Sequence, residues 1–396
     1  MKPYTRVYAE IDLDAIEWNI KEIKRHMKPD VGIYGVVKSD GYGHGSVPVA
    51  AVLEPEVCGY AVASIEEGIL LRQHGIKKPI LVLGVTHSSR YEDLIRYDIR
   101  PAMFQLDKVR KLSEAAGVMG TCAKIHVAVD TGMSRIGLWT EETDADLILQ
   151  MSQFPHIEIE GIFTHFACAD EGEREITGEA LKKFQNLVER LEKRSLPIPV
   201  KHCANSAAIL DWPEADFDAV RAGIALYGLY PSSQVSKDQI RLRPSLSLKS
   251  FISYKKIIPA GTPVSYGGTF VSDREMTIAT VPIGYGDGYP RNVSNKGEVI
   301  IRGKRARILG RVCMDQMMVD ITHIPEAGEE DVVTLIGRDG EEEITVEDLA
   351  EVGGGFHYEI LCGLGKRVPR VYLRHGEIVG QKDYFEDQYP DFSVRM

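Results

Sequence analysis

The chain has 396 residues, of which 44% are hydrophobic and 27% are charged, and its formal net charge is −11. This length predicts two or three domains, and the composition is typical of a globular protein with a sizeable core. The negative charge argues against nucleic acid or an anionic membrane surface as a partner. No segment approaches the length of a membrane span, and residues 1–8 lack the apolar core of a signal peptide.

The six cysteines are widely spaced and include no C-x-x-C pair. This spacing fits neither a zinc site nor a disulfide framework, and it favours a reducing compartment. We therefore expect a cytoplasmic protein without a metal centre.

Strand-like runs alternate with helical stretches between residues 31 and 225. The runs are 33–37, 59–63, 80–84, 99–103, 124–129, 159–165, 200–203 and 219–224. One intervening helix is predicted to follow Ser64, with Glu67 completing a capping box and Gly75 ending it, and another spans 176–194. Eight strands alternating with helices are the signature of a (β/α)8 barrel, or TIM barrel. Because the run 99–103 is weak, a doubly wound α/β sheet is the alternative.

Beyond residue 230 the pattern changes to short alternating runs broken by glycine, which continue over residues 246–340. They predict a second, predominantly β-strand domain, with a helix near 345–352. We expect the barrel to occupy residues 1–235 and the second domain residues 236–396, with the first ten or so residues pairing with the second domain.

The most informative segment is Lys38-Ser39-Asp40-Gly41-Tyr42-Gly43-His44-Gly45, which follows the first buried strand. A lysine at the carboxyl end of such a strand lies in a partly dry setting, where its amine can become a nucleophile. The glycines leave room for a planar ligand near the backbone. An amine nucleophile over a flat pocket suggests a Schiff base, for which pyridoxal phosphate is the commonest partner. The alternative is a solvated lysine at a strand–loop junction.

Other polar residues also fall at the carboxyl ends of predicted strands, where barrel enzymes place their active sites. Residues 130–135 follow the fifth strand, His165 closes the sixth, Asn205 and Ser206 follow the seventh, and Arg221 lies in the eighth. Each alone has a structural alternative, such as a core histidine for His165 or an ion pair for Arg221. Their common placement favours a site.

Nine ordered motifs resemble those of the bacterial alanine racemases over essentially the full length of the chain. They are V-V-K-S-D-G-Y-G-H-G, D-T-G-M-S-R-I-G, T-H-F-A, H-C-A-N-S-A, R-A-G-I-A-L-Y-G, V-S-Y-G, I-G-Y-G-D-G, C-M-D-Q and K-R-V-P-R. The resemblance implies a barrel with a second β-domain. It also implies a pyridoxal phosphate-dependent enzyme that interconverts L- and D-alanine and so supplies D-alanine for peptidoglycan.

The resemblance further implies roles for individual residues. Lys38 forms the Schiff base and acts as one base, and Tyr266 acts as the second base. The implied cofactor-binding residues are Lys38, Tyr42, Leu83, His165, Asn205, Ser206, Arg221, Gly223, Ile224 and Tyr358, with Arg221 facing the pyridine nitrogen. The implied substrate-binding residues are Arg135, Met314 and Asp315. Tyr266 and the C-M-D-Q loop come from the other subunit, so a homodimer with shared active sites is expected.

The chain departs from the family pattern at one position. Many members carry a carbamylated lysine seven residues before the arginine of T-G-M-x-R, and Ala128 stands there in this chain. We predict that a chloride ion or water fills the space beside Arg135. The departure also leaves a serine or broad-specificity amino-acid racemase as an alternative.

Two readings from other classes share the barrel. A non-catalytic pyridoxal phosphate carrier is disfavoured, because carriers of that type lack the second domain that supplies Tyr266. An amino-acid decarboxylase has a barrel and a β-domain, but its pyridine partner is an acid, whereas Arg221 is a base.

Overall fold

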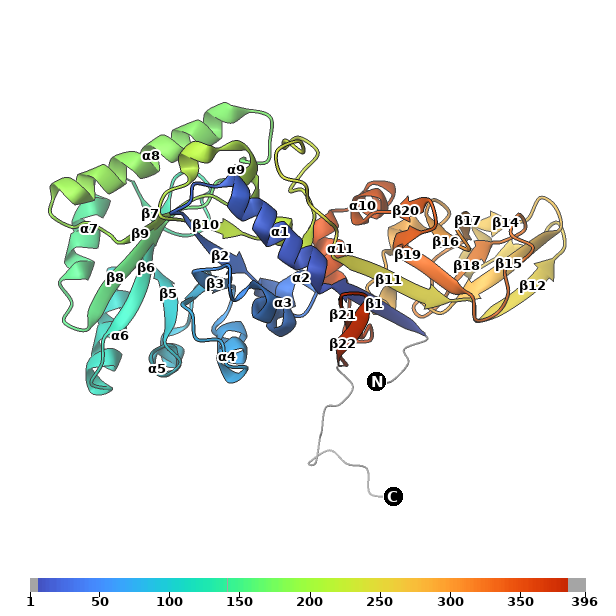
Figure 1. Ribbon diagram of the computed structural model, residues 1–396, viewed down its shortest axis with the longest axis horizontal. Helices are drawn as coiled ribbons and strands as arrows, with labels where there is room; N and C mark the ends of the chain where they lie inside the picture. Colours follow the sequence, from blue (N-terminus) through green and yellow to red (C-terminus); the bar gives the residue numbers. More distant parts are fainter. Residues whose placement is uncertain (1–5, 141, 384–396) are drawn as a thin grey trace, which may run out of the picture. The chain divides into compact units, whose positions relative to one another are not determined.

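A computed structural model of the chain describes residues 6–140 and 142–383. The described residues form two compact units, coloured by sequence position in Figure 1. The first contains Ala15–Tyr42 and Ser46–Pro244, and the second contains residues 6–14, Gly43–Gly45 and residues 245–383. The domain boundary that we predicted after residue 235 therefore lies nine residues before the end of the first unit at Pro244.

The first unit is built on eight parallel strands that form a nearly closed barrel. In the sheet they run in the order β10-β2-β3-β4-β5-β6-β8-β9. Their bounds are β2 (Gly32–Val36), β3 (Gly59–Val62), β4 (Ile80–Val82), β5 (Ile99–Met103), β6 (Ala123–Asp130), β8 (Ile157–Phe163), β9 (Val200–His202) and β10 (Ala219–Ala222). The two end strands are joined by Asp218 N–H donating to Lys201 O at 3.0 Å and Arg221 N–H to Ala204 O at 2.9 Å. The barrel prediction is confirmed, and the doubly wound alternative is wrong because β9 and β10 lie side by side and nearly close the ring.

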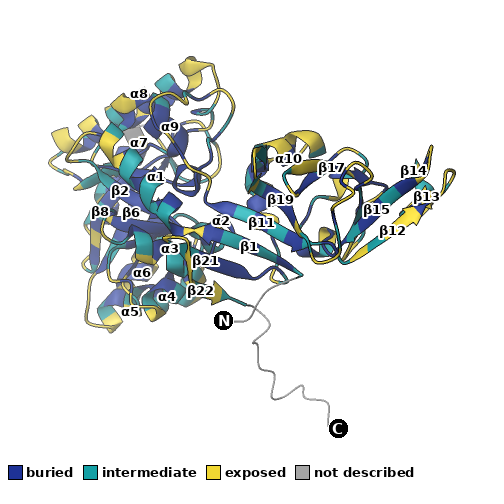
Figure 2. Cartoon of the chain, turned by 45° about the vertical axis from the view of Figure 1, so that its right-hand side comes forward, coloured by how far each residue is buried: buried dark blue, intermediate teal, exposed yellow. Residues whose placement is uncertain are grey.

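The fourth predicted strand, β5, forms in spite of its weak sequence signal. All five of its residues are buried, and it pairs with both β4 and β6. Packing on both faces thus outweighs the weak local preference, as is usual for a parallel strand covered by helices. Figure 2 shows the barrel strands largely buried and the exposed residues gathered on the helices and loops around them.

Helix α1 (Leu13–His26) precedes the first barrel strand, and other helices follow most of the barrel strands. The following helices are α3 (Ser46–Leu53), α4 (Ile65–Gln73), α5 (Tyr91–Arg96), α6 (Leu106–Val118), α7 (Glu142–Ser152), α8 (Arg174–Lys193) and α9 (Ser206–Asp211). Helix α4 begins at the capping box of Ser64 and Glu67, and Gly75 follows its end with φ of +86°. Helix α8 buries residues at helical spacing, including Ala180, Phe184 and Leu191, and so presents one apolar face.

The second unit is mostly β-structure. Its largest sheet runs in the order β12-β15-β18-β17-β16-β19-β11-β1-β21-β22, with β20 beside β19. The strands are β1 (Val7–Asp12), β11 (Leu246–Phe251), β12 (Tyr254–Ile258), β15 (Met276–Val281), β16 (Glu298–Ile301), β17 (Lys304–Leu309), β18 (Met317–Asp320), β19 (Val332–Asp339), β20 (Glu342–Ile344), β21 (Arg370–Arg374) and β22 (Glu377–Lys382). Strand β1 pairs antiparallel with β11 and parallel with β21. Helices α10 (Val346–Gly353) and α11 (His357–Gly363) complete this unit.

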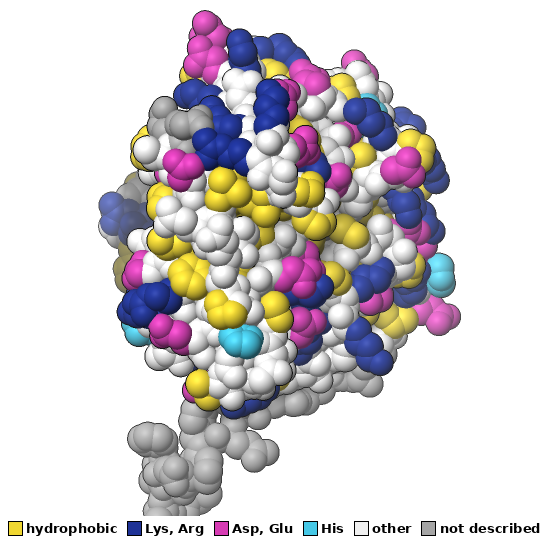
Figure 3. Space-filling model, turned by 90° about the vertical axis from the view of Figure 1, so that its left-hand side faces the viewer, with side chains coloured by type: hydrophobic (Ala, Val, Ile, Leu, Met, Phe, Trp, Pro, Cys, Tyr) yellow, Lys and Arg dark blue, Asp and Glu magenta, His cyan; other side chains and the backbone are white. Residues whose placement is uncertain are grey.

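The surface mixes charges of both signs. On the face in Figure 3, acidic and basic side chains of the described residues are interspersed around smaller hydrophobic areas. None of the helices in the described part of the chain combines the length and the apolarity that a bilayer crossing requires.

Candidate active site in the barrel

A pocket of about 220 Å³ opens at the carboxyl ends of the barrel strands. Five residues with predicted roles line it together, and they are Lys38, Leu83, Arg135, His165 and Arg221. Lys38, Leu83, Arg135 and His165 follow β2, β4, β6 and β8, and Arg221 lies within β10. The barrel therefore gathers an amine, an imidazole and two guanidinium groups from distant parts of the chain into one cavity.

The backbone after Lys38 is strained. Ser39, Asp40, Gly41 and Tyr42 all have positive φ values between 51° and 62°, so the segment makes a left-handed turn. Left-handed backbone costs a non-glycine residue roughly 1–2 kcal/mol. The turn is held by Ser39 N–H, which donates to the Glu67 carboxylate at 2.6 Å, and by Gly41 N–H, which donates to Val37 O at 2.8 Å. We predicted a tight glycine loop here, and nothing in the sequence pattern indicated four consecutive left-handed residues ending at Tyr42.

Arg221 lines the pocket, and almost all of its N–H groups donate hydrogen bonds to acceptors of the protein. Its NH1 group donates to His202 Nδ1 at 2.9 Å and to the carbonyl of the same residue at 3.0 Å. Its NH2 group donates to Thr164 O at 2.8 Å, Cys203 O at 3.0 Å and His165 Nδ1 at 3.2 Å. Among the described residues, none accepts a hydrogen bond from its Nε–H. Burial lowers the pKa of the guanidinium to about 10, so it remains a cation at neutral pH.

His165 is a neutral imidazole whose orientation Arg221 determines. Because Arg221 donates to Nδ1, the proton of the neutral ring lies on Nε2. Burial, together with the positive charges of Arg221, Arg135 and Lys38, lowers the pKa of this imidazole to about 3. His165 therefore offers an N–H donor to the pocket.

A second group of predicted residues lies around Gly223. A β-carbon built on this glycine would lie 2.9 Å from the Tyr42 hydroxyl and 3.6 Å from Ser206 Oγ, so the glycine keeps open the space between two hydroxyl groups. Ser206 Oγ accepts a hydrogen bond from Gly223 N–H at 2.9 Å. No described residue accepts one from Ile224 N–H. Two hydroxyls and a backbone N–H around a small space are donors suited to a phosphate group.

Asn205 differs from its neighbours because its side chain caps a helix. Its Oδ1 accepts a hydrogen bond from Ala208 N–H at 3.0 Å at the start of α9. This contact gives the residue a structural role in addition to the cofactor role that the resemblance implied.

The remaining predicted residues belong to the second unit. Tyr266 begins a short 3-10 turn, η4 (Tyr266–Gly268), and 69% of the residue is exposed. Met314 is 51% exposed, and Asp315 forms an ion pair with Arg367 at 2.7 Å. The ring of Tyr358 stacks on Phe356 with a centroid distance of 4.6 Å.

The surroundings of Arg135 and Ala128 differ sharply. Ala128 is buried in an apolar cluster with Ala102 and Phe163. Within the described residues, no carboxylate pairs with Arg135, whose exposed guanidinium lines the pocket. The predicted chloride ion or water beside Arg135 stays a prediction.

Comparison with known proteins places this geometry in a family. The model of the "Alanine racemase, N-terminal domain" matches residues 11–231, and that of the "Alanine racemase, C-terminal domain" matches residues 245–372. This chain belongs to the alanine racemase family. The resemblance drawn from the nine motifs is therefore confirmed, and so are the combination of a barrel with a β-rich second domain and the class of amino-acid racemase.

Individual relatives match this chain over nearly its whole length. Alanine racemase 1 of Clostridium acetobutylicum is 45% identical over 379 residues, which are 96% of this chain and 98% of the relative. A solved alanine racemase of Clostridium difficile 630 has a TM-score of 0.93 and 41% identity, and the match covers 97% of this chain and 100% of that one. A histidine racemase of Leuconostoc mesenteroides has a TM-score of 0.86 at 28% identity, covering 94% and 99%.

Three polar residues deep in this racemase barrel were not singled out by the sequence analysis. His126, Glu160 and His202 have side chains inside or near the centre of the barrel, and both histidines are completely buried. His202 lies within the motif H-C-A-N-S-A, but neither its spacing nor its type indicated a role. Polar residues at inward-facing strand positions were the signal that could have identified the two histidines.

Proposed function

We propose that this protein interconverts L- and D-alanine with pyridoxal phosphate, which Lys38 binds covalently. The observation that carries the proposal is that Lys38, His165 and Arg221 line one pocket in a chain of the alanine racemase family. The D-alanine formed in this way would supply peptidoglycan synthesis. Relatives named alanine racemase support alanine as the substrate, and the solved relative from Bacillus anthracis is described with bound L-Ala-P.

The residues present fit this cofactor. The one guanidinium donor of Arg221 that lacks a described acceptor, Nε–H, would bind the pyridine nitrogen. Tyr42, Ser206 and the Ile224 N–H would hold the phosphate around the space that Gly223 leaves open. We further propose Leu83 and Tyr358 as cofactor contacts. When bound, pyridoxal phosphate withdraws electrons from the α-carbon of the amino acid and makes its proton acidic.

Racemisation requires a proton to leave one face of the α-carbon and another to reach the opposite face. The Lys38 amine would serve one face and the Tyr266 phenolate the other. His165 carries its proton on Nε2, so it can donate a hydrogen bond that stabilises a phenolate beside it. Tyr266 is exposed in its own unit, and we propose that it reaches the barrel pocket of a second subunit in a homodimer.

The other proposed contacts orient the substrate and limit side reactions. Arg135 would bind the α-carboxylate, since a guanidinium forms paired hydrogen bonds to a carboxylate. Met314 and Asp315 would line the substrate side from the partner subunit. Because the Arg221 guanidinium does not give up its proton, it would leave the pyridine nitrogen unprotonated. The cofactor would then be a weaker electron sink, which would disfavour transamination.

A second candidate is racemisation of a different or larger amino acid. The likeness to a histidine racemase at 28% identity shows that one fold serves side chains of different size. Incubation of the purified protein with L-alanine, L-serine and L-histidine in heavy water distinguishes the candidates. Loss of the α-proton signal by NMR, together with D-isomer by chiral chromatography, is expected to be fastest for alanine.

Two variants test the roles of the proposed bases. Lys38→Ala should lose the yellow cofactor band. Tyr266→Phe should keep this band but lose turnover by about 10²–10⁴-fold, the usual contribution of a positioned acid–base group. A wild-type protein that binds the cofactor, is dimeric and exchanges no amino acid would instead support the carrier reading.

A further inference from the structure

A continuous chain of buried polar groups runs from Arg221 through the centre of the barrel. Arg221 NH1 lies 2.9 Å from Nδ1 of His202, and Nε2 of His202 lies 2.8 Å from Nδ1 of His126. Nε2 of His126 then lies 3.3 Å from the Glu160 carboxylate. The chain therefore joins the proposed pyridine contact to a carboxylate by way of two completely buried imidazoles.

The contacts fix where every proton in this chain lies. Arginine only donates, so Nδ1 of His202 accepts and its proton is on Nε2. That proton is donated to Nδ1 of His126, whose own proton must then be on Nε2 and is donated to Glu160. Burial lowers the pKa of both imidazoles, so both are neutral at ordinary pH.

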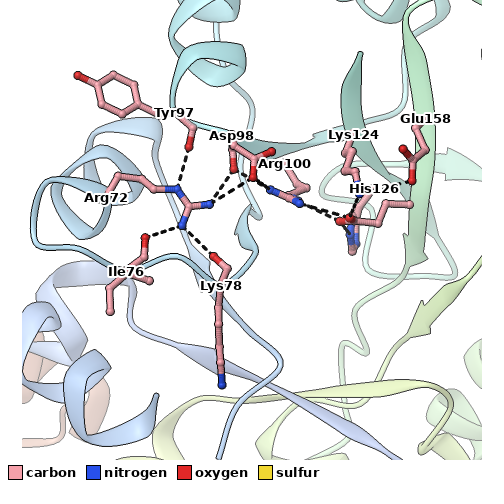
Figure 4. Close-up of polar contacts among 10 residues, drawn as sticks. Arg72, Ile76, Lys78, Tyr97, Asp98, Arg100, Lys124, His126 and Glu158 are labelled. Carbon is pink, nitrogen blue, oxygen red and sulfur yellow. Dashed lines mark hydrogen bonds and ion pairs between the residues drawn. The ribbon is translucent and has the colours of Figure 1, made fainter. Parts of the chain in front are cut away.

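Glu160 is held as an anion at the far end of the chain. Arg100 Nε contacts its carboxylate at 3.0 Å and Lys124 Nζ at 3.2 Å. The hydrogen bonds from His126, Arg100 and Lys124, together with the Arg100 charge, hold the pKa of this carboxyl well below its usual range in spite of its burial. Figure 4 shows the side chains of Arg100, Lys124 and His126 close together, and Arg100 also pairs with Asp98 at 2.7 Å.

The backbone is shaped to make room for this arrangement. Strands β6 and β8 pair Ile125 with Ile159 and His126 with Gly161, so Glu160 is an extra residue between the two pairs. A bulge of this kind re-aims a side chain. A β-carbon on Gly161 would lie 2.4 Å from His126 Nδ1, so only glycine leaves space for the imidazole.

We propose that Glu160 and His126 are positioning residues for Arg221. They hold its guanidinium through His202 so that Nε–H remains directed into the pocket, where the pyridine nitrogen is proposed to bind. The hydrogen bonds polarise the two neutral imidazoles in one direction, so that each presents the negative end of its dipole toward Arg221. This polarisation stabilises the buried Arg221 cation, which has no carboxylate partner among the described residues. This inference rests on the proposed function for the role of Arg221, but the protonation pattern itself does not.

Nitrogen NMR of the holoenzyme with ¹⁵N-labelled histidine tests the protonation pattern directly. His126 and His202 are expected to be neutral, with their protons on Nε2, throughout about pH 6–9. An ordinary imidazole would titrate at the lower end of this range. Their signals are assigned from the spectra of His126→Gln and His202→Gln. A proton on Nδ1 of either ring, or titration of either ring in this range, would overturn the proposal.

Glu160→Gln and Glu158→Gln form a matched pair that tests the effect on Arg221. Both remove one negative charge from β8 near Lys124. Glu158 lies 3.6 Å from Lys124, however, and the structure shows no hydrogen bond or ion pair between it and His126. In Glu160→Gln the Nε2–H signal of His202 should move, although His202 does not touch residue 160, and kcat should fall roughly 10-fold, the loss typical of a group that orients a contact residue. KM should change by less than about twofold, because neither Glu160 nor the two histidines that link it to Arg221 are proposed to touch substrate.

The control variant is expected to match wild type in all three readouts. Equal kcat values and unmoved His202 signals in the two variants would contradict the proposal. If Glu160→Gln does not fold, the wild-type NMR spectrum still decides the protonation pattern. A wild-type holoenzyme that shows the predicted tautomers but exchanges no amino acid would refute the proposed function rather than the chain of hydrogen bonds.

Discussion

Arg221 donates a hydrogen bond from NH2 to Nδ1 of His165 over 3.2 Å, and this contact fixes a neutral imidazole at the wall of the pocket. While this hydrogen bond persists, Nδ1 of His165 accepts from the Arg221 cation and cannot take up a proton. A histidine in this position is therefore a hydrogen-bond donor through Nε2, and not an acid that titrates in the working pH range of an ordinary imidazole.

The first prediction concerns stability and pH. The pKa of His165 in the folded protein is about 3, below its ordinary value of 6.5, so between these values the unfolded chain binds the additional proton. Stability is therefore lost as the pH falls from about 6.5 towards 3, at up to about 1.4 kcal/mol per pH unit for each such histidine. The buried His126 and His202 act in the same direction.

His165→Gln should reduce the loss of stability per pH unit by the contribution of one histidine. The measurement is the midpoint of urea unfolding at about pH 7, 6 and 5, at one fixed protein concentration because the enzyme is proposed to be dimeric. His87→Gln, which replaces an exposed histidine, should leave the dependence as in wild type. Parallel pH dependences for His165→Gln and wild type would contradict the prediction.

The second prediction concerns the space beside Gly223. Gly223→Ala places a methyl group 2.9 Å from the Tyr42 hydroxyl, inside the proposed phosphate site. The dissociation constant for pyridoxal phosphate should rise by about 10-fold or more, because one hydrogen bond to a charged group contributes about 1.5–3 kcal/mol. Equilibrium dialysis or quenching of intrinsic fluorescence measures the constant.

Gly178→Ala is the matched control for this substitution. In helix α8 its new methyl group would meet only the Trp212 ring at 4.0 Å, and alanine favours a helix over glycine. Its cofactor affinity should equal that of wild type. An unchanged affinity in Gly223→Ala, with the fold intact by circular dichroism, would show that the phosphate binds elsewhere.

The positions of Lys38, His165 and Arg221 around one pocket could be anticipated from the sequence. Lys38 and His165 lie at or just beyond the carboxyl end of a run that is apolar enough to be a buried parallel strand, and Arg221 lies within such a run. The carboxyl ends of these strands meet on one side of a barrel. The order of strands and helices alone is enough to predict which residues meet there. Even the weak run 99–103 becomes a buried strand, because its neighbours on both sides supply its pairing.

The series of hydrogen bonds from Arg221 to Glu160 could not be predicted from the sequence in the same way. In the segment that contains Glu158 and Glu160, alternation with isoleucine suggests that both carboxylates face away from the core. Glu160 turns toward His126 only because the pairing of β6 and β8 shifts by one residue there. That shift depends on contacts between strands distant in sequence. The left-handed turn after Lys38 also depends on a distant contact, because Glu67 in the first turn of helix α4 stabilises it.

The third prediction concerns Arg135 and the substrate carboxylate. Arg135→Gln should raise KM for alanine by roughly 10-fold or more, the loss expected when a charge-assisted contact worth about 1.4 kcal/mol or more disappears. Arg135→Lys keeps the charge but cannot form the paired hydrogen bonds, so its KM should lie between those of Arg135→Gln and wild type. Steady-state kinetics in both directions, from L- and from D-alanine, should show the same order of variants. An unchanged KM in Arg135→Gln would place the carboxylate elsewhere in the pocket.

The fourth prediction tests whether active sites are shared between subunits. Lys38→Ala and Tyr266→Phe are each expected to be inactive, since each removes one base from every site. In a mixed dimer of the two variants, one site lacks both bases and the other has an intact Lys38 from one chain and an intact Tyr266 from its partner. Random assortment makes half of the dimers mixed, so a co-expressed 1:1 preparation should recover about a quarter of the wild-type activity.

The mixed dimer can also be isolated, because the variants carry different affinity tags and can be purified through both tags in succession. The isolated mixed dimer should reach about half of the wild-type activity. If Lys38 and Tyr266 of one chain instead form a site together, every site in the mixed dimer lacks one base, and no activity returns.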